Sequence, residues 1–98
     1  MKETVEELIQ EAILELNEQL EEERKVSYSE DLKLIGVKAA LESISFVTLI
    51  AILEDLISDR LGKNIIIVND RAFSQERSPF RCVASLCEYV TELLLETE

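Results

Sequence analysis

One serine, flanked by an acid and an aliphatic residue, is the best-placed side chain for chemistry in this sequence. Ser43 follows Glu42 and precedes Ile44, where a long apolar pattern of helical period begins. The N–H groups of a first helical turn lack intrahelical partners, and with the helix dipole they favour an anion. An anionic group attached to Ser43 would be stabilised by about 0.3–1 kcal/mol. The alternative is that Ser43 is an ordinary N-cap, a position that serine prefers.

The sequence lacks several of the residue types and motifs on which catalysis most often depends. The sequence contains no His, which removes the commonest general base, the Ser-His and Cys-His pairs and most zinc sites. With Gly 2 and Pro 1, neither a Gly-rich phosphate loop nor a hairpin-rich β fold is available. We therefore expect a protein that is not an enzyme and that binds no metal.

The two cysteines predict reduced thiols. Cys82 and Cys87 are five residues apart, so on one helix their Cα atoms would lie roughly 8–9 Å apart, beyond disulfide reach. Reduced, partly buried thiols are typical of cytoplasmic proteins, and a redox or metal role is the alternative. The acidic N-terminus is unlike a signal peptide, and no apolar run reaches the ~18 residues of a membrane span. We expect a cytoplasmic protein without a membrane span.

Size and charge limit the class of protein further. The 98 residues suit one domain, 1–98, and an apolar share of 47% is enough for one modest core. Lys plus Arg is 10 and Asp plus Glu is 21, so the net charge is 10 − 21 = −11. This charge, with a pI near 4.4, argues against nucleic-acid binding.

Hydrophobic periodicity predicts a long first helix. Thr4 and Glu7 have the spacing of a capping box, and Arg24 and Lys25 suit the negative end of the helix dipole. Nine glutamates lie among the first 23 residues, mostly off the apolar stripe, and predict a solvated face; long-range steering of basic partners is the alternative. The stripe recurs at three- and four-residue steps and comprises Val5, Leu8, Ile9, Ala12, Ile13, Leu16 and Leu20.

A long connection and a second helix follow. Residues 26–42 have no sustained period, and their aliphatic side chains would hold this connection against the core. The second helix should run from about Ser43 to Leu61 and stop at Gly62 in the C′ position. A second face of this helix, with Ile44, Thr48, Ala51 and Asp55, is a candidate docking surface unless it packs on the connection. The core face comprises Phe46, Leu49, Ile50, Leu53, Leu56, Ile57 and Leu61.

The last third of the chain predicts a connector, a short helix and a final helix. Residues 65–68 should form an extended connector that fills the core, because the chain has no second strand-like run. Asn69 or Asp70 can cap a short helix over 70–76. Ser78-Pro79 predicts the start of the last helix, which should reach about residue 96. We expect the aromatic residues to be packing anchors: Tyr28, Phe46, Phe73, Phe80 and Tyr89.

Ile52 lies on the otherwise polar side of the second helix and is the one hint of self-association. A monomer is otherwise expected. Together these patterns predict an all-α protein with three longer helices and one short third helix.

The second helix resembles that of the acyl carrier protein family. The resemblance rests on Glu42-Ser43-Ile44, on Val47-x-Leu49-Ile50 and on Leu53-Glu54-Asp55. A long first connection, a short third helix and a Ser-Pro-Phe-Arg segment before the last helix extend it over roughly residues 5–96. The resemblance implies an acyl-carrier-like four-helix bundle, with a long loop between helices 1 and 2.

The resemblance also implies a function. Ser43 would carry 4′-phosphopantetheine, attached covalently from coenzyme A by a phosphopantetheinyl transferase, and the arm's thiol would hold an acyl group as a thioester. Such carriers deliver intermediates to acyl-loading, acyl-transfer or condensing enzymes in fatty-acid, polyketide or related lipid biosynthesis. By position, Glu42, Ile44, Thr48, Ala51 and Asp55 would belong to the partner-docking surface.

Several departures from the family pattern indicate a specialised member. Glu42 stands where Asp is usual, and Lys38-Ala39-Ala40 replaces a Leu-Gly approach. Ser45 and Thr48 stand where acidic docking residues are frequent. These departures leave open an alternative, an unmodified four-helix module for protein–protein interaction. Ser45 lacks the preceding acid and is the weaker candidate for attachment.

Overall fold

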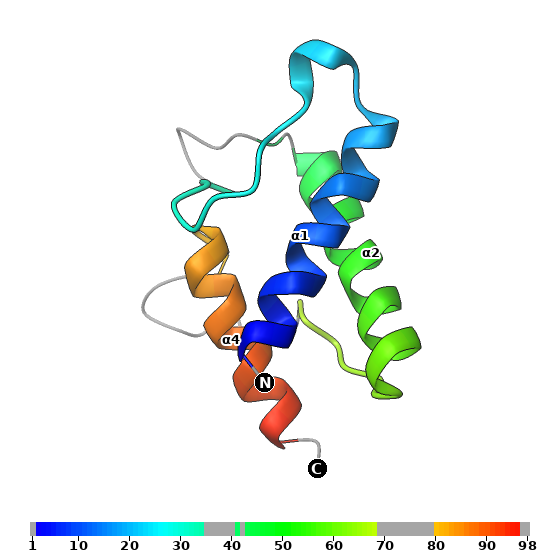
Figure 1. Cartoon of the computed structure of the whole chain (residues 1–98), viewed down its shortest axis with the longest axis vertical. Coiled ribbons are helices and arrows are strands. Elements are labelled where there is room, and N and C mark those ends of the chain that lie inside the picture. Colours follow the sequence, from blue (N-terminus) through cyan, green and yellow to red (C-terminus); the bar gives the residue numbers. More distant parts are fainter. Residues whose placement is uncertain (1, 35–40, 42, 69–79, 97–98) are drawn as a thin grey trace.

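Three α-helices lie within the described residues of a computed structural model of the chain (Figure 1). The described residues are 2–34, 41, 43–68 and 80–96. Their elements are α1 (Lys2–Gln19), the 3-10 turn η1 (Glu22–Arg24), α2 (Ser43–Leu61) and α4 (Val83–Glu96). The described ranges contain helices and no strand, so the all-helical prediction is confirmed for them. The expected short helix over 70–76 lies outside the described residues.

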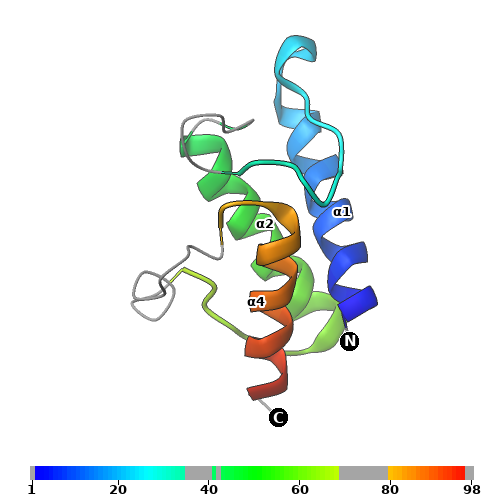
Figure 2. The ribbon, with the colours of Figure 1, turned by 90° about the vertical axis from the view of Figure 1, so that its left-hand side faces the viewer.

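Helix α1 packs against both α2 and α4, and the core lies between them (Figures 1 and 2). Each fully buried Leu or Ile side chain contributes about 1.5–3 kcal/mol relative to an exposed one. None of the described helices is long and apolar enough to cross a bilayer. The largest fully buried side chains come from all three helices and from both connections: Val5, Ile9, Ile13, Leu16, Leu34, Leu49, Leu53, Ile57, Ile67, Val83, Leu86 and Leu94.

The predicted stripe is buried from Val5 to Leu16, whereas Leu20 lies beyond the end of α1 and is only partly buried against the core. Both predicted ends of this helix are wrong. The helix begins at Lys2, before Thr4, so Thr4 lies inside the first turn and cannot be its N-cap. Packing against α4 supports this early start, because the Cys87 thiol lies 3.7 Å from the Lys2 carbonyl oxygen. At the other end α1 stops at Gln19, well before Lys25.

A polar clamp at the end of α1 explains the early stop. The Asn17 side-chain amide donates to the Val26 carbonyl at 2.8 Å, and its oxygen accepts from the Val26 N–H at 2.9 Å. The intervening residues must therefore turn back, which they do through η1, where the Arg24 N–H donates to the Glu21 carbonyl at 2.8 Å. Asn17, in the last turn of α1, thus holds the beginning of the long connection in place.

Helix α2 has the predicted bounds, Ser43–Leu61. Its predicted core residues are buried, apart from Phe46 and Leu61, which are partly buried against the core. Gly62 ends the helix with φ +65, and its N–H donates to the Ser58 carbonyl at 3.1 Å. A positive φ favours glycine because it has no Cβ.

The connector after α2 alternates between core and solvent. Ile67 is fully buried, whereas Ile66 is 69% exposed. The Ile67 N–H donates at 2.8 Å to the Glu54 carboxylate of α2. This side-chain acceptor takes the place of a strand partner. The connector forms no strand, as predicted, but only Ile67 is fully buried and Val68 is 38% exposed, so the prediction that it fills the core is confirmed for Ile67 alone.

Helix α4 begins at Val83, four residues after the predicted start at Pro79, while its predicted end is confirmed. Ser78-Pro79 itself lies outside the described residues. The delay has a tertiary cause, because the chain before α4 pairs with the first connection. The Leu34 N–H donates to the Arg81 carbonyl at 3.3 Å, and the Val83 N–H donates to the Leu32 carbonyl at 3.1 Å. A helix from Pro79 would break both bonds.

The aromatic residues pack as anchors at this junction. Phe80 meets Phe46 at 5.4 Å between ring centroids and Tyr89 at 6.1 Å, both edge to face. Such pairs contribute about 0.5–1.5 kcal/mol beyond the area that they bury. Tyr28 is partly buried against the same core. The predicted anchor role is confirmed for these four, and Phe73 lies outside the described residues.

Candidate functional site

The serine singled out in the sequence is the first residue of α2. A group attached to Ser43 would therefore lie at the positive end of a helix of 19 residues. The first turn of α2 contains no acidic residue, so no carboxylate within that turn offsets the field. Glu42 and the side chain of Ser43 lie outside what the structure describes.

An exposed apolar face begins directly after this serine. Ile44 is 80% exposed and Val47 is 64% exposed, and Ala51 is exposed one turn further on. Two exposed branched apolar side chains contribute little to the core, so packing does not explain them. The sequence interpretation assigned Val47 to the motif but not to this face. Its spacing of three from Ile44 and four from Ala51 is the signal that it belongs here.

Two further predicted docking residues, Thr48 and Asp55, flank this face. The Thr48 hydroxyl donates to the Ile44 carbonyl at 2.9 Å, so its donor is used within α2. Asp55 is exposed. Because Ile44, Ala51 and Asp55 are all exposed, the described part of the long connection does not cover this face. The alternative that the face packs on that part of the connection is therefore wrong.

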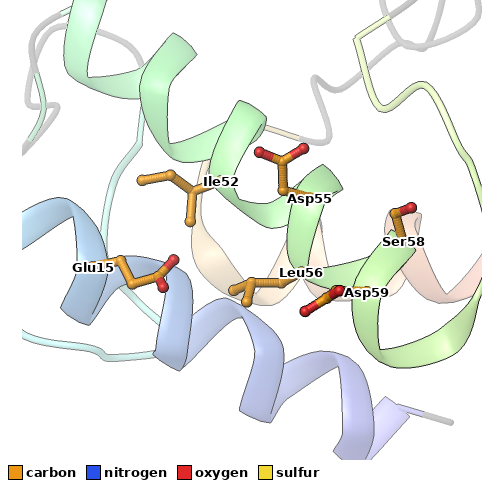
Figure 3. Close-up of a pocket in the computed structure, with 6 residues that line it drawn as sticks. All are labelled: Glu15, Ile52, Asp55, Leu56, Ser58 and Asp59. Carbon is orange, nitrogen blue, oxygen red and sulfur yellow. The ribbon is translucent and has the colours of Figure 1, made fainter.

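Asp55 also borders a groove of about 490 Å³ between α1 and α2 (Figure 3). Glu15 comes from α1, and the other lining residues come from α2; Leu56 and Asp59 point toward α1. The lining thus combines three carboxylates with a small apolar floor. Its residues are Glu15, Ile52, Asp55, Leu56, Ser58 and Asp59.

The structure also accounts for Ile52, the apolar residue on a polar side. It is half-buried against the core because α1 runs alongside α2 at this point. The expectation of an exposed Ile52 as a hint of self-association is therefore wrong. Nearby, the Arg60 guanidinium pairs with the Glu11 carboxylate across the two helices, and this hydrogen bond raises the pKa of Arg60.

The two cysteines form no disulfide, as expected, and differ in environment. Cys82 directly precedes α4, so the cysteines do not share one helix as the sequence suggested. Burial opposes ionisation of Cys82, but hydrogen bonds with Ser85 and the Ala84 backbone, together with the nearby Arg81 charge, outweigh it and lower the pKa of this thiol. Burial raises the pKa of the Cys87 thiol, and the nearby Glu6 carboxylate adds to that rise.

The described residues contain no group of three or more His, Cys, Asp or Glu side chains placed to hold a metal ion. The start of α2 thus combines three features without a metal site: a helix N-terminus, a serine, and an exposed apolar face.

Comparison with known proteins identifies no relative, because no family model, no curated protein and no solved structure matches the chain.

Proposed function

We propose that this protein is an acyl carrier that bears a 4′-phosphopantetheine arm on Ser43 and itself catalyses no step. The observation that carries the proposal is a juxtaposition. Ser43 is the first residue of α2, and the exposed side chains of Ile44 and Val47 follow it within one turn. A modifying enzyme could hold the apolar face while it acts on the adjacent hydroxyl.

The loading step needs no base from this chain. The Ser43 hydroxyl oxygen attacks phosphorus in the diphosphate of coenzyme A and forms a new O–P bond. The bond to the leaving adenosine bisphosphate breaks, and the serine proton passes to a base of the transferase. The product is a phosphodiester, and the N-terminal field of α2 favours its negative charge. The absence of His from the chain is consistent with this division of labour.

Docking should be brief because a carrier must leave each enzyme after delivery. Ile44, Val47 and Ala51 would make the apolar contact, and Asp55 would meet a basic residue of the partner. Charge complementarity raises association rates more than affinity. Once docked, the tethered thiol reaches the partner's active site at a high effective concentration.

The proposal includes the four-helix layout with a short helix over 70–76. Backbone chemical shifts of the purified protein would test that helix independently of function. Helical shifts across 70–76 are expected, and extended or random-coil shifts there would contradict this part of the proposal.

Loading is tested by intact-mass analysis after incubation with coenzyme A and a broad-specificity phosphopantetheinyl transferase. Wild type should gain one arm, and Ser43→Ala should gain none. Ser45→Ala is the matched control, because Ser45 lies in the same turn, and it should load like wild type. A wild type that gains no mass, or a Ser43→Ala variant that still gains it, would overturn the assignment.

The second candidate is an unmodified module for protein–protein interaction. The exposure of Ile44 and Val47 favours it too, because such a face could bind a partner without any arm. The two functions differ in their dependence on Ser43. If unmodified wild type and Ser43→Ala bind a partner equally tightly while neither can be loaded, the interaction module is the correct function.

A further inference from the structure

A second hollow lies between the turn that follows α1 and the start of α2. Its volume is about 300 Å³, the lower end of the range of about 300–1,000 Å³ for small-molecule pockets. Leu41 and Ser45, on either side of Ser43 in the sequence, both line it. Each of them is two positions from the proposed attachment point in the sequence.

The hollow has an apolar floor and a partly basic rim. Leu20, Val26 and the buried Leu41 supply the apolar lining. Arg24 and Lys25 lie at the same hollow, which is notable in a chain of net charge −11. An anion held there would meet cations and avoid most of the acidic surface.

Two carboxylates lie close to these cations and would compete with a bound anion for them. Glu23 also lines the hollow, and Glu22 pairs with Lys25 at 3.0 Å. The Lys25 and Glu22 side chains are 42% and 88% exposed, and exposed ion pairs of this kind contribute only about 0–1 kcal/mol. A phosphodiester attached nearby can therefore replace Glu22 as the partner of Lys25.

The arm has the chemistry that this lining would recognise. Next to the serine oxygen it carries a phosphodiester anion, and next to that a dimethyl-substituted carbon. The anion suits Arg24 and Lys25, since guanidinium and ammonium groups bind phosphate oxygens strongly. The dimethyl carbon suits the apolar floor of Leu20, Val26 and Leu41.

We infer that the hollow between the first connection and the start of α2 is a docking site for the proximal part of the phosphopantetheine arm. This inference rests on the proposed function and adds to it. The arm then lies against Arg24, Lys25 and the apolar floor between deliveries, and only its distal part moves freely. Docking to a partner would release it.

The test compares amide proton–nitrogen correlation spectra of the unloaded and loaded protein. Loading should shift the amides of residues 20–26, which are distant from Ser43 in the sequence. Arg24→Glu and Lys25→Glu should each accept the arm, as checked by intact mass, yet lose the loading-dependent shifts in 20–26. Lys33→Glu is the control: it makes the same charge change at another exposed lysine of the connection and should keep the shifts.

The possible results distinguish a failure of the docking site from a failure of the proposed carrier function. If wild type accepts no arm, the proposed function fails and the docking site fails with it. If wild type is loaded but residues 20–26 do not shift, the carrier function stands and the docking site is wrong. Shifts that persist in both rim variants would also overturn the docking site. If the loading-dependent shifts are lost in Lys33→Glu too, the docking site is also wrong, because the shifts would then reflect a general effect of charge.

Discussion

At the scale of single residues, the exposed side chains of α2 say most about function. Ile44 and Val47 are branched, apolar and mostly in solvent, a choice that neither helix propensity nor core packing favours. Leu14 on α1 is comparably exposed at 61% but has no neighbouring serine at a helix start. The functional weight of an exposed apolar residue therefore depends on its place in the fold.

Ile44→Ala should slow loading without unfolding the protein. Removing an exposed side chain leaves the core intact, whereas losing a central interface contact costs about 1–2 kcal/mol, or roughly tenfold in kcat/KM of the transferase. Steady-state loading kinetics measure this effect, and thermal unfolding should stay unchanged. Leu14→Ala is the matched control and should load normally. An Ile44→Ala variant that loads as fast as wild type would remove Ile44 from the docking face.

The two thiols should differ in reactivity. The thiolate is the nucleophile, so a lowered pKa shifts labelling of Cys82 to lower pH than for an ordinary cysteine, and a raised pKa shifts Cys87 to higher pH. Burial also protects Cys87 from the reagent, because this residue is only 2% exposed. Alkylation with iodoacetamide across a pH series, read by peptide mass, should modify Cys82 first. Preferential modification of Cys87 in the folded protein would contradict this order.

At the scale of elements, the sequence predicts best what local residues decide. The bounds of α2 follow from its apolar stripe and from Gly62, which adopts the positive φ expected of a stop. The start of α4 does not follow from local residues. Ser78-Pro79 is a local helix-start signal, and the hydrogen bond between the Leu34 N–H and the Arg81 carbonyl overrides it. The sequence places Ile44 and Ala51 on the apolar face, and the spacing of Val47 from both of them puts it on the same side of the helix.

Asn17→Ala should loosen the junction between α1 and the connection. The variant would leave the Val26 N–H and carbonyl without the partners they have in the fold. A hydrogen bond of this kind contributes about 0.5–1.5 kcal/mol net, so we expect the loss of both to lower the free energy of unfolding by about 1–3 kcal/mol. Denaturant unfolding measures it, with Gln10→Ala as the exposed control on the same helix. Equal stability of the two variants would show that the clamp is not what ends α1.

At the scale of the whole molecule, the proposed function gives the net charge a role in how a carrier would meet its partners. A charge of −11 on a small protein produces a long-range field that attracts basic surfaces. The field acts on encounter more than on the lifetime of the complex. The first turn of α2 contains no acidic residue, so under the proposed function the charge would bring partners near and the exposed apolar face would determine which of them fit.

Salt should therefore slow loading mainly through association. Raising ionic strength from about 0.05 to 0.5 M shortens the Debye length several-fold, and we expect kcat/KM for loading to fall by about tenfold while kcat changes little. Asp55→Asn should weaken this salt dependence, whereas Ile44→Ala should keep it because it alters no charge. A salt-independent kcat/KM would show that the acidic surface serves another purpose.

The most direct test of the central claim is to locate the arm in the loaded protein by fragmenting its peptides in a mass spectrometer. The account predicts phosphopantetheine on Ser43, with Ser45 unmodified in the same peptide. A peptide that stays unmodified after exposure to coenzyme A and competent transferases, or an arm found on Ser45, would contradict it.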